Sequence, residues 1–393
     1  LFYALSDAAS LPLFLASMAF NMAMGLLIER AHAGRKALLA LGVAGNLGFL
    51  GWSKYTGFLA SQIPGLEFLA GTGPSAMPLG VSFFTFSALA YLVDIFRGSV
   101  RAQTDPLRFG LFLAFFPKVT AGPIARFPDM DGEPGRMTLE NLREGLARVG
   151  VGLAKKVLVA GTLAPVADAA FGAAPGRLDM GTAWLGLFCY SLQLNFDYPY
   201  SSQSVREFWR RWHMTLSSWF RDYLYIPLGG GRVAPWKVQR NLLIVFVLCG
   251  LWHGASWSFV AWGLWHGVFL AMERTRLGRA IDGLPRPARH LYALAAVGLG
   301  WVFFRAPTLD AAFSYLQAMF SFGFDGFAYT WLVRVNREFL LMAAVACAGC
   351  FPLIPWLAAR LGPLRPAAGA LVPPALLALA VMQLAAGTHS PFI

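Results

Sequence analysis

The chain alternates between long apolar runs and short basic blocks, and this alternation restricts its fold more than any other feature. Runs such as Leu11–Ile28, Ala37–Ala60 and Met77–Phe96 have about the length that a helix needs to cross a bilayer, roughly 20 residues. Within hydrocarbon, backbone polar groups can be satisfied only inside helices or closed barrels. The chain is 57% hydrophobic and only 13% charged, whereas soluble domains carry about 25% charged residues. We therefore predict an all-α polytopic membrane protein in which residues 1–393 form a single integral-membrane domain.

The basic residues account for a formal net charge of +12, which in a soluble protein would suggest nucleic acid. Here they lie in short blocks between apolar runs, so the positive-inside rule explains them and no nucleic-acid partner is predicted. The rule places three blocks on the cytoplasmic side of the membrane, where they can contact membrane lipids. These blocks are Glu29–Lys36, Arg97–Lys156 and Arg206–Arg240. Ser61–Ala76 and Pro175–Gly181 are then expected outside.

The apolar segment Asn241–Met272 has basic blocks at both ends. Two full crossings need about 40 residues plus a turn, and this run has roughly 32. A single crossing would place a strongly basic loop outside. We therefore predict a re-entrant or short-helix hairpin that enters from the cytoplasm, with its turn near Gly250–Ser256. Non-helical backbone at that depth is tolerated only inside protein or facing water.

Two Trp-His-Gly triplets lie in this hairpin, at Trp252–Gly254 and Trp265–Gly267, and His213 closes an aromatic run upstream. Histidines in a hydrocarbon environment are rare and mark chemistry more often than packing. His253 falls at the predicted turn, so it is the candidate catalytic base, since a neutral imidazole accepts a hydroxyl proton near neutral pH. His213 and His266 are candidate supporting residues, together with Trp252, Ser256 and Trp257.

A metal or bound cofactor is not predicted. The spacing of thirteen between the triplet histidines resembles half of a bis-haem pair, but no second helix supplies two matching histidines. Cys347-x-x-Cys350 has no second cysteine pair, which speaks against zinc.

The segment Ser204–Tyr225 is predicted to be one amphipathic helix at the cytoplasmic interface. Its apolar face recurs at helical spacing and its other face is basic. One interpretation is an interfacial anchor, and the other is a mouth that attracts an anionic acyl donor such as a coenzyme A thioester. The apolar face comprises Phe208, Trp212, Leu216, Trp219 and Tyr223, and the candidate donor-binding residues are Arg206, Arg210, Arg211 and Arg221. The glycines of Pro227–Gly231 then predict a turn.

Two further polar positions lie in apolar runs. Lys54 either extends to the membrane interface or has a function. Asp94 and Arg97 lie one helical turn apart and are expected to form an ion pair.

Together these segments resemble the membrane-bound O-acyltransferase superfamily, and most closely its alginate O-acetylation branch, with the teichoic acid D-alanyl transfer branch nearby. The resemblance runs through nearly the whole chain, and its most specific part is Glu207–Gly267 with both triplets. The matching segments are Ser82–Gly98, Phe115–Phe127, Glu207–Arg232, Asn241–Gly267 and Ser390–Ile393.

The resemblance implies a ring of about eleven helices around a central tunnel, with re-entrant and interfacial helices. It implies an O-acyltransferase of the bacterial inner membrane, most simply an O-acetyltransferase, with His253 as the catalytic histidine. The donor would be a cytoplasmic thioester, acetyl-CoA or an acyl carrier. The acyl group would pass outward to an exopolysaccharide or cell-envelope glycan through an extracytoplasmic acyltransferase partner. The alternative interpretation is a polysaccharide or lipid transporter with gating histidines, for which the inverted repeats expected of transporters are not visible.

The chain departs from the family pattern at two places. Members of the family have an additional stretch, about one membrane helix long, at the place where Leu194 is directly followed by Asn195 in this chain. They also have another helix ahead of the position of Leu1. The apolar run Thr182–Leu194 is also short for a crossing. We therefore expect residues to be missing at both places, which the intact mass of the purified protein would test.

Overall fold

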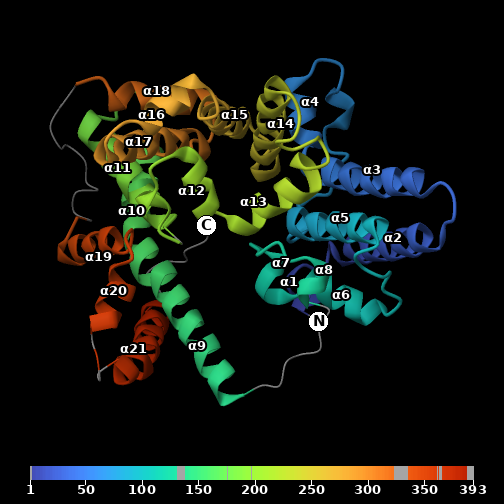
Figure 1. The fold of residues 1–393 in the computed structure, drawn as a ribbon, viewed down its shortest axis with the longest axis horizontal. Coiled ribbons are helices and arrows are strands. Elements are labelled where there is room, and N and C mark those ends of the chain that lie inside the picture. Colours follow the sequence, from blue (N-terminus) through green and yellow to red (C-terminus); the bar gives the residue numbers. More distant parts are fainter. Residues whose placement is uncertain are drawn as a thin grey trace. The chain divides into compact units, whose positions relative to one another are not determined.

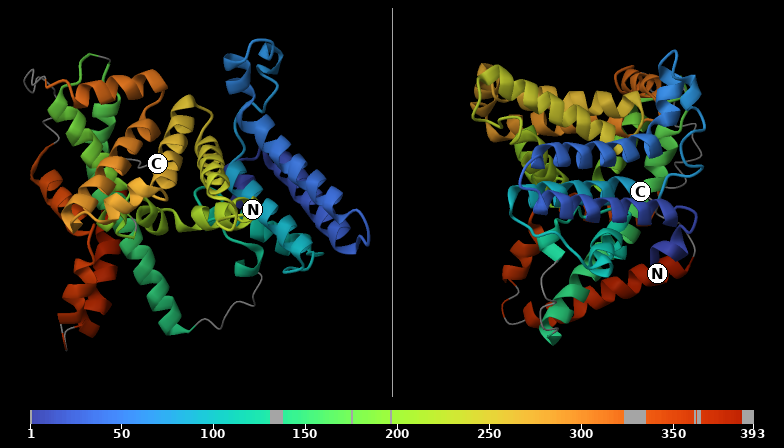
Figure 2. Two further views of the ribbon diagram at one scale, coloured as in Figure 1. Left: turned by 45° about the horizontal axis from the view of Figure 1, so that its top comes forward. Right: turned by 90° about the vertical axis from the view of Figure 1, so that its right-hand side faces the viewer.

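The computed structural model describes residues 2–130, 138–174, 176–195, 197–322, 335–360, 362 and 365–386. Within these ranges the regular structure is helical and no strand occurs, which confirms the predicted all-α class (Figures 1 and 2). The chain divides into two compact units. Unit 1 comprises residues 1–135, 215–241 and 252–255, and unit 2 comprises residues 136–214, 242–251 and 256–393. This division does not test the predicted single domain, which stays a prediction.

Unit 1 is built on three neighbouring apolar helices, α2 (Leu11–Arg30), α3 (Arg35–Lys54) and α5 (Val81–Arg97) (Figure 1). Asn21 and Asn46 join α2 to α3 by reciprocal side-chain hydrogen bonds of 2.7 and 3.1 Å. The shorter helices of this unit are α1 (Phe2–Ser6), α4 (Thr56–Gln62), α6 (Pro106–Ala114), α7 (Phe116–Val119), α8 (Phe127–Met130), most of α13 (Met214–Phe220), and the helical turns Glu67–Leu69 and Arg221–Tyr225.

Unit 2 contains the longest continuous helical stretch, in which α9 (Leu139–Ala154) passes through a π-helical segment, Lys155–Ala160, into α10 (Gly161–Phe171). The C-terminal helix α21 (Arg365–Ala385) packs along α9 (Figure 2). The other helices are α11 (Met180–Gln193), α12 (Val205–Arg211), α15 (Trp257–Met272), α16 (Arg276–Asp282), α17 (Arg286–Arg305), α18 (Leu309–Met319), α19 (Arg337–Ala348), α20 (Leu353–Arg360) and the short turn Pro199–Ser201.

Helix α14 (Pro235–His253) carries the first triplet and α15 carries the second. The backbone leaves α14 after His253 and re-enters a helix at Trp257, so the turn predicted within Gly250–Ser256 is confirmed. The expectation that both helices are short holds only for α15. Helix α14 begins at Pro235, six residues before Asn241, and its 19 residues extend about 28 Å at 1.5 Å per residue.

Side-chain caps explain several helix starts. Asp105 accepts the N–H of Leu107 at 2.8 Å at the start of α6, and Thr138 accepts the N–H of Asn141 at 3.1 Å at the start of α9. Such caps satisfy amide groups that have no partner within the helix. The loop ahead of α9, Arg136 included, lies outside the described residues.

Two helices of the described chain are long and apolar enough to cross a membrane, Leu11–Arg30 and the continuous Leu139–Phe171. The apolar runs Ala37–Ala60 and Phe339–Trp356 are long enough for the sequence to predict one spanning helix in each, and this prediction was wrong. Helix α3 ends at Lys54, and the second run is interrupted between α19 and α20. For Ala311–Phe327 the sequence predicts an interfacial helix, and the structure has α18, which ends earlier, at Met319. Residues 323–327 lie outside the described residues, as does the motif Ser390–Ile393.

Candidate active site

His253 is the last residue of α14, and its position follows from how the chain leaves that helix. Gly254 and Ala255 are not helical, and the Ser256 side chain accepts the N–H of Ser258 at 3.3 Å to start α15. The His253 residue is partly exposed, but its Nε2 atom is buried. The structure therefore places an imidazole at the turn, as the sequence predicts, and makes Ser256 a helix cap. Trp257, in the first turn of α15, is 51% exposed.

Aromatic side chains of unit 1 hold the residue before His253. Trp252 packs edge-on against Phe83, with ring centroids 5.3 Å apart, and tilted against Phe86 at 5.5 Å. Phe86 in turn stacks on Trp219 at 3.9 Å, and the Trp219 indole donates to the Phe86 carbonyl at 3.0 Å. These contacts fix the end of α14 against α5 and surround it with apolar surface.

Lys54, the last residue of α3, reaches the same turn. Its Nζ donates to the backbone carbonyl of Trp252 and, at 3.2 Å, to that of His253. The Ser82 hydroxyl lies 3.5 Å from Nζ. These contacts hold the ammonium group at the turn. They do not fit the interpretation in which Lys54 extends to the membrane interface.

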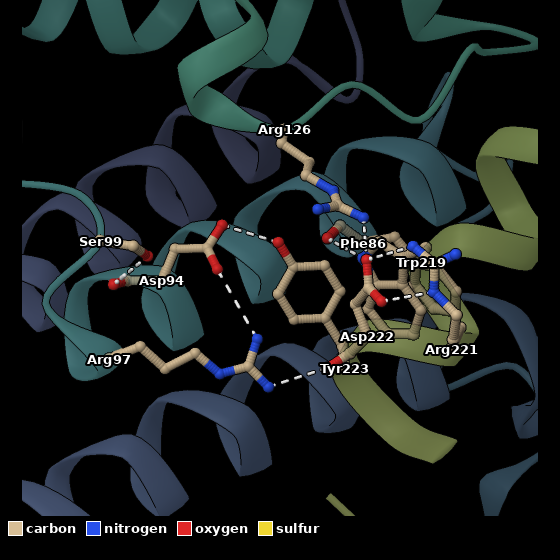
Figure 3. Close-up of polar contacts among 9 residues, drawn as sticks. All are labelled: Phe86, Asp94, Arg97, Ser99, Arg126, Trp219, Arg221, Asp222 and Tyr223. Atoms are coloured by element: carbon tan, nitrogen blue, oxygen red, sulfur yellow. Dashed lines mark hydrogen bonds and ion pairs between the residues drawn. The ribbon is translucent and has the colours of Figure 1, made fainter. Parts of the chain in front are cut away.

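A second polar cluster in unit 1 lies at the other end of α5, around Asp94 (Figure 3). The Tyr223 hydroxyl donates to Asp94 at 2.7 Å, and Arg97 lies 3.9 Å from the same carboxylate, which confirms the expected Asp94–Arg97 pair. Arg97 also donates to the Asp222 carbonyl at 2.8 Å. The cluster thus ties the end of α5 to the helical turn Arg221–Tyr225.

Asp222 extends this cluster toward two further arginines. Arg221 forms an ion pair with it at 2.7 Å, and Arg126 pairs with its other carboxylate oxygen. The hydrogen bond from Arg221, followed by the one from Arg126, lowers the pKa of the Asp222 carboxyl, so Asp222 is ionised at neutral pH. The cluster joins three segments that carry the family resemblance, Ser82–Gly98, Phe115–Phe127 and Glu207–Arg232 (Figure 3).

His266 lies in unit 2, fully buried. The Trp209 indole donates to its Nδ1 at 3.3 Å, so the neutral ring carries its proton on Nε2. Trp262 approaches edge-on at 5.2 Å between ring centroids, and Phe208 stacks at 6.4 Å. A Cβ atom added to Gly300 would lie 2.8 Å from Nε2. This tight packing encloses the His266 ring within unit 2, and its supporting role stays a prediction.

The predicted single helix over Ser204–Tyr225 was wrong. Helix α12 ends at Arg211, and α13 begins at Met214. Between them His213 adopts a left-handed backbone, with φ of +46°, which a non-glycine residue rarely takes. The proposed apolar face is therefore not one continuous face, because the helix axis is interrupted at its centre. Desolvation lowers the pKa of His213 to about 4, so this ring is neutral at physiological pH.

Three of the four candidate donor-binding arginines face a carboxylate. Arg206 lies 3.9 Å from Glu273, Arg211 lies 3.1 Å from Glu207, and Arg221 pairs with Asp222. Arg210 is exposed, and no acidic side chain of the described chain pairs with it. The donor-binding role of the four stays a prediction, with Arg210 carrying the least compensated charge.

Glu273, the first residue after α15, is a structural residue that the sequence analysis does not identify. Its buried carboxylate accepts the N–H groups of Val205 and Arg206, at 2.6 and 3.0 Å, and caps α12. It also accepts the Tyr292 hydroxyl at 3.1 Å. In the described part of the chain no group of three His, Cys, Asp or Glu side chains could hold a metal ion.

The turn after His253 lies within a region that matches a known family. The model of the membrane-bound O-acyltransferase family matches residues 193–280. The chain is 39% identical to the probable alginate O-acetylase AlgI of Azotobacter vinelandii, covering 82% of this chain and 71% of that protein. The chain belongs to the membrane-bound O-acyltransferase family. This confirms the resemblance drawn from the motifs, and the chain is accordingly an acyltransferase and a membrane protein.

Other relatives mark the range of the similarity. The peptidoglycan O-acetyltransferase of Helicobacter pylori is 33% identical over 86% of this chain and 75% of its own length. The teichoic acid D-alanyltransferase of Streptococcus thermophilus is 29% identical over 47% of this chain and 53% of its own length.

Proposed function

We propose that the chain is a multi-pass inner-membrane O-acetyltransferase that moves an acetyl group from a cytoplasmic thioester to a cell-envelope polysaccharide. The observation that carries the proposal is the position of His253, at an anchored turn inside the family match. Relatives named for alginate and for peptidoglycan O-acetylation support an acetyl group and a glycan acceptor. Family membership also favours an acyltransferase over the transporter alternative.

The chemistry requires one base and no bound cofactor. Neutral His253 accepts the proton of the attacking hydroxyl as its oxygen attacks the thioester carbonyl. The tetrahedral intermediate then collapses, the C–S bond breaks, and the imidazolium returns the proton to the leaving thiolate. The products are an O-acetyl ester and a free thiol, with the histidine neutral again.

The same proposal includes the surroundings of this step. A ring of about eleven helices would enclose a tunnel with His253 inside, and the donor would be acetyl-CoA or an acyl carrier, attracted by the arginines of α12. An extracytoplasmic acyltransferase partner would receive the acetyl group and complete its transfer to the polysaccharide. Buried aromatic packing around Trp252 supports a site from which bulk water is excluded.

His253→Ala tests the proposal directly. Loss of a general base lowers the rate by about 10²–10⁴, so acetyl transfer from radiolabelled acetyl-CoA should fall into that range while expression and detergent elution stay normal. His290→Ala is the matched control and should leave the transfer rate unchanged. His290 lies outside both triplets, on α17, where its ring contacts the Ser202 carbonyl at 3.2 Å. Activity of His253→Ala within a few-fold of the unmodified protein would contradict the assignment.

Turnover in detergent separates the two function classes. An acyltransferase should release free thiol from acetyl-CoA when an acceptor alcohol is present, without any sealed compartment. A transporter would show activity only as movement of a substrate across a vesicle membrane.

A further inference from the structure

The end of α14 presents backbone carbonyls that have no partner within the helix. The last four C=O groups of any α-helix are in this position, and the aligned peptide dipoles give that end a partial negative charge. In α14 these carbonyls include those of Trp252 and His253, because His253 is the last helical residue. Their partner comes from a distant part of the sequence.

That partner is the ammonium group of Lys54, which donates to both carbonyls, those of Trp252 and His253. An ammonium group away from water is costly unless it is paired, and a helix C-terminus is a favourable place for a cation. The Ser82 hydroxyl near the start of α5 completes its surroundings at 3.5 Å. The charge of Lys54 is thus matched by backbone rather than by a carboxylate.

We propose that Lys54 is the positioning residue for His253, holding the peptide that carries the catalytic imidazole. The inference rests on the proposed role of His253 as the base. Lys54 does not touch the reacting atoms. By fixing two successive carbonyls it sets the direction in which the Cα–Cβ bond of His253 leaves the helix, and Trp252 packed on Phe83 fixes the neighbouring residue. Without the ammonium group the last turn of α14 loses its tether, and the imidazole moves relative to the thioester.

Lys54→Met tests this inference, because methionine has a similar apolar stem and cannot donate. A displacement of about 1 Å in a catalytic group costs on the order of 10²-fold in rate. The kcat for acetyl transfer from acetyl-CoA should therefore fall by about 10- to 100-fold, while the KM for acetyl-CoA changes less than about twofold. Lys54→Arg, which keeps a cationic donor, should recover a large part of the lost kcat.

Lys36→Met is the matched control, since Lys36 lies at the exposed start of the same helix. It should leave kcat and KM unchanged. If Lys54→Met does not yield a monodisperse protein, Lys54→Gln replaces it, because the amide can still donate to one carbonyl. The expected kcat for glutamine lies between those of methionine and the unmodified protein.

The outcomes separate this inference from the proposed function. An inactive His253→Ala together with a fully active Lys54→Met or Lys54→Gln overturns the positioning role and leaves the base in place. A loss that appears in KM rather than kcat, or that arginine does not relieve, also overturns it. Active His253→Ala would remove the basis of both proposals.

Discussion

A single hydrogen bond decides the chemical state of one of the two triplet histidines. Trp209 donates to Nδ1 of His266 at 3.3 Å in a fully buried site, so Nδ1 carries no proton and cannot act as a donor. His253 has a different environment, at a turn, with a cation on its backbone. Identical Trp-His-Gly triplets therefore lie in different environments, and the difference comes from what each helix packs against.

The bond to His266 predicts the effect of Trp209→Phe. Phenylalanine keeps an aromatic ring, although a smaller one, but removes the indole donor, and the buried Nδ1 is left without its partner. The free energy of unfolding should fall by about 1–3 kcal/mol, measured as a lower melting temperature in detergent. Trp236→Phe, at a 59% exposed position in α14, should change stability by less than about 0.5 kcal/mol. Equal melting temperatures for both variants would contradict a structural role for this bond.

At the scale of elements, the close approach of α14 and α15 depends on glycines. A Cβ atom on Gly263 would lie 2.2 Å from the Phe246 carbonyl oxygen, and one on Gly250 would lie 2.2 Å from the Phe259 carbonyl oxygen. Both obstacles are backbone atoms, which cannot rotate away. Glycines at the contact between two membrane helices allow their backbones to pack closely against each other.

Gly263→Ala should therefore separate α15 from α14. Overpacking of this kind costs typically 1–3 kcal/mol, so we expect less monodisperse protein and a lower melting temperature. Gly152→Ala in α9 is the matched control. Its added Cβ meets no atom within 4 Å, and alanine favours a helix over glycine by about 1 kcal/mol. A Gly263→Ala protein as stable as Gly152→Ala would show that the two helices can move apart without loss.

The same elements show what could be predicted from the sequence. The apolar runs predicted the helical class, and Gly254 and Ser256 predicted the turn after His253. The break at His213 could not be predicted, because no proline or glycine marks it and the flanking residues keep helical spacing. The sequence does not decide between the two interpretations of Lys54, because its partners are backbone carbonyls 198 and 199 residues away, which no sequence pattern reveals.

For the whole molecule, the net charge of +12 raises the question of whether donor recruitment is local or general. A diffuse positive field attracts any anion, whereas a local site depends on particular arginines. In α12 the Arg206 side chain is held at the buried Glu273, so Arg210 has the most freedom to meet a donor, followed by Arg211, whose partner Glu207 is itself partly exposed. These two can be changed without disturbing the cap that Glu273 provides.

The double variant Arg210→Gln/Arg211→Gln decides between the two possibilities. Removing one exposed and one partly exposed charge, at roughly 0.5 kcal/mol each, corresponds to about a fivefold higher KM for acetyl-CoA. The effect should shrink in high salt, because exposed charges are screened, and kcat should stay unchanged. Arg143→Gln/Arg148→Gln removes the same charge from the exposed side of α9, where Arg143 pairs with Glu140 and Arg148 pairs with Glu144. A KM increase in the first variant alone places donor binding at α12. Equal increases in both variants would assign recruitment to the overall charge, and no increase in either would leave the arginines of α12 as a membrane anchor.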